Sequence, residues 1–260
     1  MSFAETVLLS AFAGGTIFLG LPVGRLRNLS PRTQAMLTTG AGGVILFLIW
    51  DILSQAVEPV EAALEGARTG SAPASEFVID AGTLGLSLGI GLLTLVWVMQ
   101  RIRAGRGEGI PARNVALGTA LGLGLHNFSE GLAIGQSAVT GATTLALILV
   151  IGFALHNATE GFGIAAPLAT GAQPSWSFLA LAGLVGGGPT FVGGVVGYSF
   201  TSPLLSIAFL GLAAGALIFV FNEIMATSRR FAEPLAANAA LLIGLLAAFA
   251  TDFVLVAAGA

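Results

Sequence analysis

The middle of the chain contains two copies of a short motif whose side chains can bind metal. The copies are HNFSEG at residues 126–131 and HNATEG at residues 156–161, so both follow the pattern H-N-x-[S/T]-E-G. Together they contain both histidines of the protein. Histidine and glutamate are four residues apart in each copy, which places the two side chains on one face of a helix. The six candidate ligands are His126, Asn127, Glu130, His156, Asn157 and Glu160.

These side chain types predict a site for a divalent transition metal. Two consecutive helices joined by a short loop run antiparallel, so the two copies can face each other about a pseudo-two-fold axis. Imidazole suits Zn, Fe and Co, while carboxylate and amide oxygens extend the range toward Mn and Cd. Two glutamates also neutralise a divalent cation in a low-dielectric interior. The alternative is a set of polar contacts that joins helices without an ion, and the duplication of the pair disfavours it.

The composition indicates a protein that crosses a membrane several times. Hydrophobic residues make up 55% of the 260 residues, charged residues make up 9%, and the mean hydropathy is +0.93. Soluble domains carry about 25% charged residues. The absence of cysteine excludes disulfides and thiolate ligands, and the absence of lysine excludes a retinal Schiff base. The chain also lacks a basic tract that would bind nucleic acid.

Apolar segments of about 20 residues, the length that crosses a bilayer, recur along the whole chain. They predict an all-α polytopic membrane protein of eight transmembrane helices in one domain, residues 1–260. The first segment lacks a basic leader region, so we expect it to be a helix and not a cleaved signal peptide. The 37 glycines predict close helix packing. The expected helices are residues 5–24, 34–56, 79–100, 115–137, 143–168, 177–200, 203–227 and 235–258.

The arginines predict the orientation. Nine of the ten fall in the connections after the first, third and seventh expected helices. The positive-inside rule then places these connections in the cytoplasm and both termini on the extracellular or periplasmic side of a plasma (inner) membrane. The connection at residues 57–78 begins with EPVEAALEGA, which favours a helical extension, and then becomes rich in Gly, Ser and Pro. We expect mainly a solvated, acidic loop there.

Three further carboxylates fall inside the expected helices, where a charged side chain costs at least about 2.5–3.5 kcal/mol. Asp51 lies toward the outer end of the second helix, where it could help ions to enter. Glu223 lies toward the inner end of the seventh helix, near the expected exit, and Asp252 lies near the outer end of the eighth. Polar contacts between helices explain each of them equally well.

The sequence resembles the ZIP family of divalent-metal transporters over about residues 5–258. The likeness is most specific at the two motifs, and it is supported by GALIFVFNE at residues 215–223 and by the plan of eight helices with both ends outside. The resemblance implies a binuclear metal site between the fourth and fifth helices. It also implies an elevator-like movement of helices 1, 4, 5 and 6 against a scaffold of helices 2, 3, 7 and 8, and it favours Glu223 as a transient ligand.

The resemblance also implies individual ligand roles. It places His126, Glu130, His156 and Glu160 at the primary site, and Asn127 and Asn157 at a second site that both glutamates bridge. The family usually has proline before the motif glutamate, where this chain has Ser129 and Thr159, so the helices should be straighter here. The family often has a glutamate on the sixth helix, where this chain reads GGGPTF and Thr190 falls near the expected position.

The predicted function is therefore transport of a divalent metal into the cytoplasm by alternating access. Zinc is the first choice, Cd, Fe, Mn and Co are alternatives, and one or two ions are expected per site. A membrane-embedded metallohydrolase would need His-Glu-x-x-His, but asparagine follows each histidine here, so we expect no enzyme. A cation channel using the same site stays open. The expected partners are the metal ion and the lipid bilayer, and small-residue faces on the scaffold helices are compatible with a homodimer.

Overall fold

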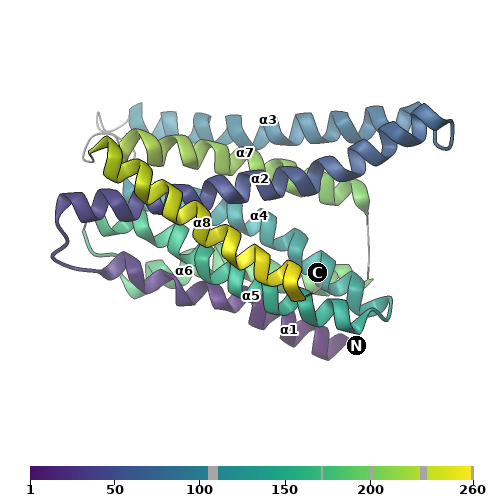
Figure 1. Ribbon diagram of the computed structural model, residues 1–260, viewed down its shortest axis with the longest axis horizontal. Coiled ribbons are helices and arrows are strands. Elements are labelled where there is room, and N and C mark those ends of the chain that lie inside the picture. Colours follow the sequence, from purple (N-terminus) through teal and green to yellow (C-terminus); the bar gives the residue numbers. More distant parts are fainter. Residues whose placement is uncertain (105–110, 171, 200–201, 229–232, 259–260) are drawn as a thin grey trace.

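The chain forms a bundle of long helices (Figure 1). The computed structural model describes residues 1–104, 111–170, 172–199, 202–228 and 233–258, and every regular element within them is a helix. The elements are α1 (Phe3–Gly15), η1 (Thr16–Leu19), η2 (Leu21–Arg25), α2 (Pro31–Thr69), α3 (Ala74–Ala104), α4 (Ala112–Val139), α5 (Thr143–Ala165), η3 (Ala166–Thr170), α6 (Trp176–Ser199), α7 (Pro203–Ser228) and α8 (Pro234–Ala258).

Within the described residues, seven helical segments are long and apolar enough to cross a membrane. α1 and the two short helices after it count as one of these segments, Phe3–Arg25. α4 is not among the seven, because the polar residues of its motif lower its hydropathy. Its 28 residues span about 42 Å, which is long enough to cross. α5, α6 and α7 pack around α4, so its polar side chains need not face lipid.

The helices fall into two groups by their contacts. In one group α4 packs along α6 and α5, and α1 packs on the same two helices. In the other group α3 packs along α7, and α2 packs along α8 and α7. Figure 1 shows α2, α3 and α7 on one side of the bundle and α1, α5 and α6 on the other. The groups meet where α4 contacts α7 and where α5 contacts α2 and α8.

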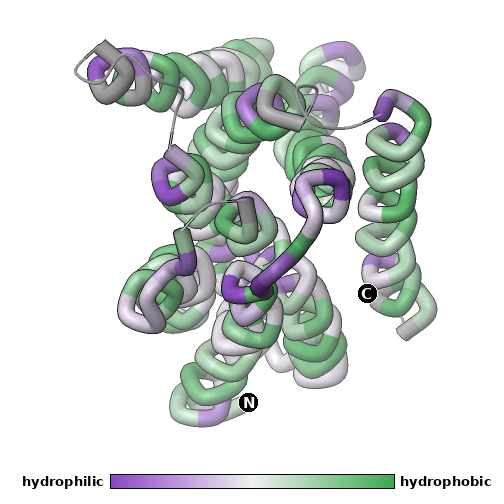
Figure 2. Tube along the Cα trace, turned by 90° about the vertical axis from the view of Figure 1, so that its left-hand side faces the viewer, coloured by the Kyte–Doolittle hydropathy of each residue, from purple (hydrophilic) through white to green (hydrophobic). Residues whose placement is uncertain are grey.

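Apolar side chains fill the space where the groups meet. Leu48 of α2, Leu123 of α4 and Leu217 of α7 belong to one buried cluster and are at most 1% exposed. Figure 2 shows a tube that is mostly green or pale, with much of the hydrophilic colour at helix ends. This distribution is the one expected of helices whose flanks face hydrocarbon.

Successive helix ends lie at alternate ends of the bundle, as eight crossings predict. The Met1 amino group donates to the Ala138 carbonyl at the end of α4, and the Tyr198 hydroxyl at the end of α6 donates to the Met1 carbonyl. Arg25 donates to the Pro174 carbonyl, which joins two connections at the opposite end. The N-terminus and the end of α8 lie at the same end of the bundle (Figure 1). Of the arginines used to predict the orientation, Arg106, Arg229 and Arg230 lie outside the described residues.

The connection at residues 57–78 is mostly helical, so the helical extension that EPVEAALEGA favours is confirmed and the expected loop is much shorter than predicted. α2 has 39 residues and continues to Thr69, so it is about 58 Å long, nearly twice the roughly 30 Å of hydrocarbon. α3 begins at Ala74, which leaves a short turn at residues 70–73. Ala56, Val60 and Ala63 recur at helical spacing and are buried, which gives the extension a packed face. α2 ends at Gly70, whose φ of 74° is a left-handed conformation that glycine adopts without steric cost.

Glycines allow α4 and α6 to approach closely. A Cβ atom at Gly131 of α4 would overlap the carbonyl oxygen of Thr190 on α6. A Cβ atom at Gly193 of α6 would overlap the carbonyl oxygen of Phe128 on α4. Small residues at such contacts let two backbones pack directly in a membrane. Other α6 glycines allow a similar approach of α1, since a Cβ atom at Gly187 would overlap the carbonyl oxygen of Gly14.

We expect Gly193→Ala to lower the melting temperature of the purified protein, because the added methyl group would overlap the α4 backbone. Overpacking of this kind costs about 1–3 kcal/mol. Gly89→Ala on α3 is the matched control, since a Cβ atom there meets nothing within 4 Å among the described residues, and alanine favours a helix by about 1 kcal/mol over glycine. Thermal unfolding in detergent compares the two. Equal melting temperatures would contradict the close approach of α4 and α6.

Candidate metal site

α4 buries the three candidate ligands of the first motif copy. His126 and Asn127 are fully buried, and Glu130 is only 4% exposed. The Nε2 atom of His126 lies 3.3 Å from Oε1 of Glu130, one helical turn along. The spacing of four residues thus brings the imidazole and the carboxylate together on one face, as the motif predicts.

α5 carries the second copy, after a short turn at residues 140–142 that contains Gly141 with a φ of 83°. Asn157 and Glu160 are both fully buried. His156 lies within α5, but its side chain is outside the described part of the structure. Two amides, two carboxylates and one imidazole of the predicted ligand set are therefore seen in the interior, and the second imidazole is not described.

The two copies contact each other through their asparagines. Asn127 Nδ2 donates to Glu160 Oε2 at 2.7 Å, and Asn157 Nδ2 donates to Glu130 Oε2 at 3.5 Å. Each asparagine thus reaches the glutamate of the other copy, which is the reciprocal pattern that a pseudo-two-fold relation predicts. Asn157 Nδ2 is also held by the Phe153 carbonyl of its own helix at 2.8 Å.

Three oxygen atoms converge on the amide nitrogen of Asn127. They are Oδ1 of Asn157 at 2.6 Å, Oε2 of Glu160 at 2.7 Å and the carbonyl oxygen of Gly186 at 3.0 Å. An amide nitrogen carries only two hydrogens, so it cannot fully satisfy three acceptors at once. The Oδ1 atom of Asn127 is buried and has no hydrogen-bond partner among the described residues. This set of oxygens suits a divalent cation, since carboxylate, amide and backbone oxygens are all metal ligands.

The carbonyl of Gly186 was not predicted as part of the site. Every residue has a carbonyl oxygen, so residue type carries no direct signal for it. The only sequence signal was the run of three glycines at 186–188 on the sixth helix. α6 thus contributes to the network through its backbone, at a helix where relatives of the ZIP family were expected to offer a carboxylate.

The ionisable side chains are paired within the network instead of forming one cluster. Among the described residues, no group of three or more His, Cys, Asp and Glu is placed to hold a metal ion. His126 pairs with Glu130, while Glu160 accepts a hydrogen bond from Asn127. Hydrogen bonds between buried polar groups offset much of the cost of removing them from water. The five candidate ligands whose side chains are described therefore lie together and are bonded to one another.

The hydroxyl residues named from the sequence differ in their surroundings. Ser129 and Thr190 have buried hydroxyl oxygens without a hydrogen-bond partner among the described residues. Thr190 is fully buried on α6, and its backbone lies against Gly131 of the first copy. Thr159 is half-buried and lines a groove between α2, α5 and α8. Of these three hydroxyl residues, Thr190 is the one that lies on α6, next to the first motif copy.

The remaining carboxylates lie on the other helix group. Asp51 is half-buried on α2 and accepts a hydrogen bond from Gln55 Nε2 at 2.8 Å. Glu223 and Asp252 are half-buried on α7 and α8. Both helices pack against α2, so these residues belong to the helix group that does not carry the motif copies.

Comparison with known proteins connects this geometry to a family. A family model described as ZIP Zinc transporter matches residues 98–251, which is more than half of the chain and includes both motif copies. A search of curated proteins finds no match. The match, the all-helical membrane fold and the buried twin motif agree with one another. The chain therefore belongs to the ZIP zinc transporter family.

Proposed function

We propose that this protein carries a divalent metal ion, zinc in the first place, across the membrane through a site between α4 and α5. The observation that carries the proposal is the buried network in which the two motif copies meet. A carboxylate inside a membrane-spanning helix is costly, and such residues mark ion pathways by default. Glu130 and Glu160 are both buried at one place, in a chain whose family moves metal ions.

The proposed ligands are the residues of both copies. His126, Glu130, His156 and Glu160 form the primary site, and Asn127 and Asn157 complete a second position that both glutamates bridge. The carbonyl of Gly186 adds an oxygen ligand from α6. In this proposal an entering ion takes the place of the Asn127 nitrogen among its three oxygens, and the amide turns so that Oδ1 faces the ion. One or two ions occupy the site, and neither reacts there, so the protein is not an enzyme.

The proposed movement is elevator-like. α1, α4, α5 and α6 would carry the site past the scaffold of α2, α3, α7 and α8 within a single transporter domain, residues 1–260. The division of the contacts into these two groups supports the proposal. We propose movement of metal into the cytoplasm, with both termini on the outer side of the plasma membrane, Asp51 on the entry route and Glu223 on the exit route.

The transport proposal is tested with purified protein in liposomes that contain a zinc-sensitive dye. We expect saturable zinc entry that Cd²⁺ and Mn²⁺ inhibit, and its loss in the double variant His126→Ala/Glu160→Ala. Gln136→Ala is the matched control, because Gln136 is exposed on the same helix as His126, and it should transport normally. Zinc binding without entry would contradict transport and favour a receptor or an enzyme. Entry that does not saturate would favour a channel.

A second prediction concerns the three oxygens around Asn127. Asn127→Asp replaces the donating amide with a third carboxylate beside Glu130 and Glu160, so the metal-free protein should melt at a lower temperature because like charges repel. A bound cation relieves this repulsion, so the rise in melting temperature caused by zinc should be larger than in the wild type.

The control for this prediction is Asn238→Asp, which introduces the same charge at an exposed position near the start of α8. Its zinc-dependent rise in melting temperature should equal that of the wild type. A smaller rise in Asn127→Asp than in the wild type would show that the Asn127 position does not face the ion. Differential scanning fluorimetry with and without zinc measures all three proteins.

A further inference from the structure

A groove of about 600 Å³ lies between α2, α5 and α8, outside the network of the two motif copies. Its walls are apolar and include Met36 and Leu37 of α2, Phe162 of α5 and Ile243 of α8. Ile243 is 66% exposed, so the groove opens on the outer surface of the bundle. All three helices are long and apolar enough to cross a membrane. Lipid is therefore the medium that meets the opening.

The groove has the depth of one leaflet. Its lining on α2 runs from Thr33 to Val44, which corresponds to a rise of about 16 Å along the helix. This is about half of the roughly 30 Å of hydrocarbon in a bilayer. Its lining on α8 runs from Ala240 to Ala247. The groove thus occupies the half of the bundle in which α2 and α8 begin, and it ends near mid-membrane.

The mouth of the groove is suited to a phosphate group. α2 begins at Pro31 and α8 begins at Pro234, so two helix N-termini contribute partial positive charge there. Arg32 precedes the lining residue Thr33, and its side chain is 67% exposed. Its acidic neighbour Glu233 is 3.7 Å away and 63% exposed. A pair at this distance and exposure is weak, so the guanidinium can also bind an anion.

We propose that this groove binds one acyl chain of an anionic phospholipid, from the leaflet in which α2 and α8 begin, with the headgroup phosphate at Arg32. The apolar walls suit the chain, the depth suits its length, and the charge at the mouth suits the phosphate. The site does not depend on metal binding. Thr159 lines the groove and directly precedes Glu160, so the lipid contacts the helix that carries the second motif copy.

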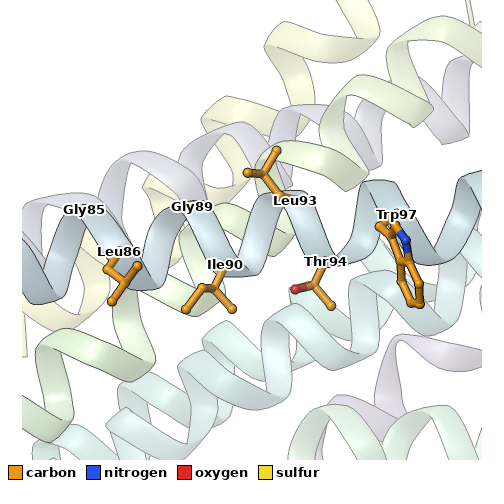
Figure 3. Close-up of a pocket in the computed structure, with 7 residues that line it drawn as sticks. All are labelled: Gly85, Leu86, Gly89, Ile90, Leu93, Thr94 and Trp97. Carbon is orange, nitrogen blue, oxygen red and sulfur yellow. The ribbon is translucent and has the colours of Figure 1, made fainter.

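A second, more open groove on α3 is a suitable reference for lipid that binds without specificity (Figure 3). All seven of its lining residues come from α3 alone, and Leu86, Ile90, Leu93 and Trp97 are among them. Leu86 and Leu93 are 67% and 64% exposed. In the part of the chain that the structure describes, this lining comes from one helix and contains no charged residue. It serves as an internal reference for lipid that exchanges freely.

The test uses the full-length protein in nanodiscs with phosphatidylglycerol that carries a diazirine on one acyl chain. After irradiation, labelled peptides are mapped by mass spectrometry. We expect labelling at Met36, Phe162 and Ile243 to saturate with the amount of lipid and to be reduced by unlabelled phosphatidylglycerol. Labelling at Leu86 and Leu93 should rise without saturation. Groove labelling that rises in the same way as α3 labelling would overturn the proposal.

Two variants on one helix make the test specific. Ala247→Phe places a phenyl group in the groove from the exposed side of α8, and we expect it to abolish groove labelling. Ala250→Phe is the same change at an exposed position of α8 outside the lining, and labelling should persist. Labelling that persists in Ala247→Phe would overturn the occupancy of the groove by lipid.

The headgroup is tested by competition. Phosphatidylglycerol should compete better than phosphatidylcholine in the wild type. Arg32→Gln should weaken competition by phosphatidylglycerol about fivefold and leave competition by phosphatidylcholine unchanged, because one basic side chain near the surface contributes about that factor. Equal competition by both lipids in the wild type would overturn the role of Arg32.

Discussion

The cost of placing carboxylates at mid-membrane determines much of this structure. Glu130 and Glu160 are both buried, and no water of the bulk phase can solvate them there. Each accepts a hydrogen bond from the asparagine of the opposite motif copy. The pairing works only if α4 and α5 run antiparallel with their motifs at the same depth. The repeat in the sequence and the arrangement of the two helices therefore follow from one requirement.

The same requirement explains the close packing around α4. A helix with this many polar residues cannot face lipid, so other helices must enclose it, and α6 contacts it most extensively. Glycines at 131 and 193 bring the two backbones into contact, and this contact places the Gly186 carbonyl 3.0 Å from the Asn127 nitrogen. Close packing is therefore not the only effect of these glycines. They let a backbone oxygen of α6 join a network that otherwise consists of side chains.

The sequence predicted the fold well where one physical signal dominated. Runs of about 20 apolar residues predicted the helices to within a few residues at most ends, and the spacing of four residues predicted the contact of His126 with Glu130. The loop expected at residues 57–78 is limited to residues 70–73, because the helical extension that EPVEAALEGA favours continues to Thr69. Ala56, Val60 and Ala63 form a buried helical face there, and this packing outweighs the exposure of the neighbouring glutamates.

The site was predictable only in part, because some of its groups are not encoded by residue type. The sequence predicted the two asparagines beside the glutamates. That each asparagine donates to the glutamate of the other copy depends on how α4 and α5 face each other. The role of Gly186 depends on the distance between α4 and α6, which a single sequence does not specify. Such contacts follow from tertiary packing and not from local pattern.

α5 combines two kinds of contact on its opposite faces. Asn157 and Glu160 point into the polar network, whereas Ala158, Thr159 and Phe162 line the groove toward α2 and α8. Hydrogen bonds are directional and specify one arrangement of α5 with α4. Apolar contacts with a groove or with an acyl chain are not directional, so they change little when one surface slides along another. A helix built in this way would keep its candidate ligands in register with α4 while its outer face shifted against α2 and α8, which is the mechanical property that the proposed elevator-like movement requires.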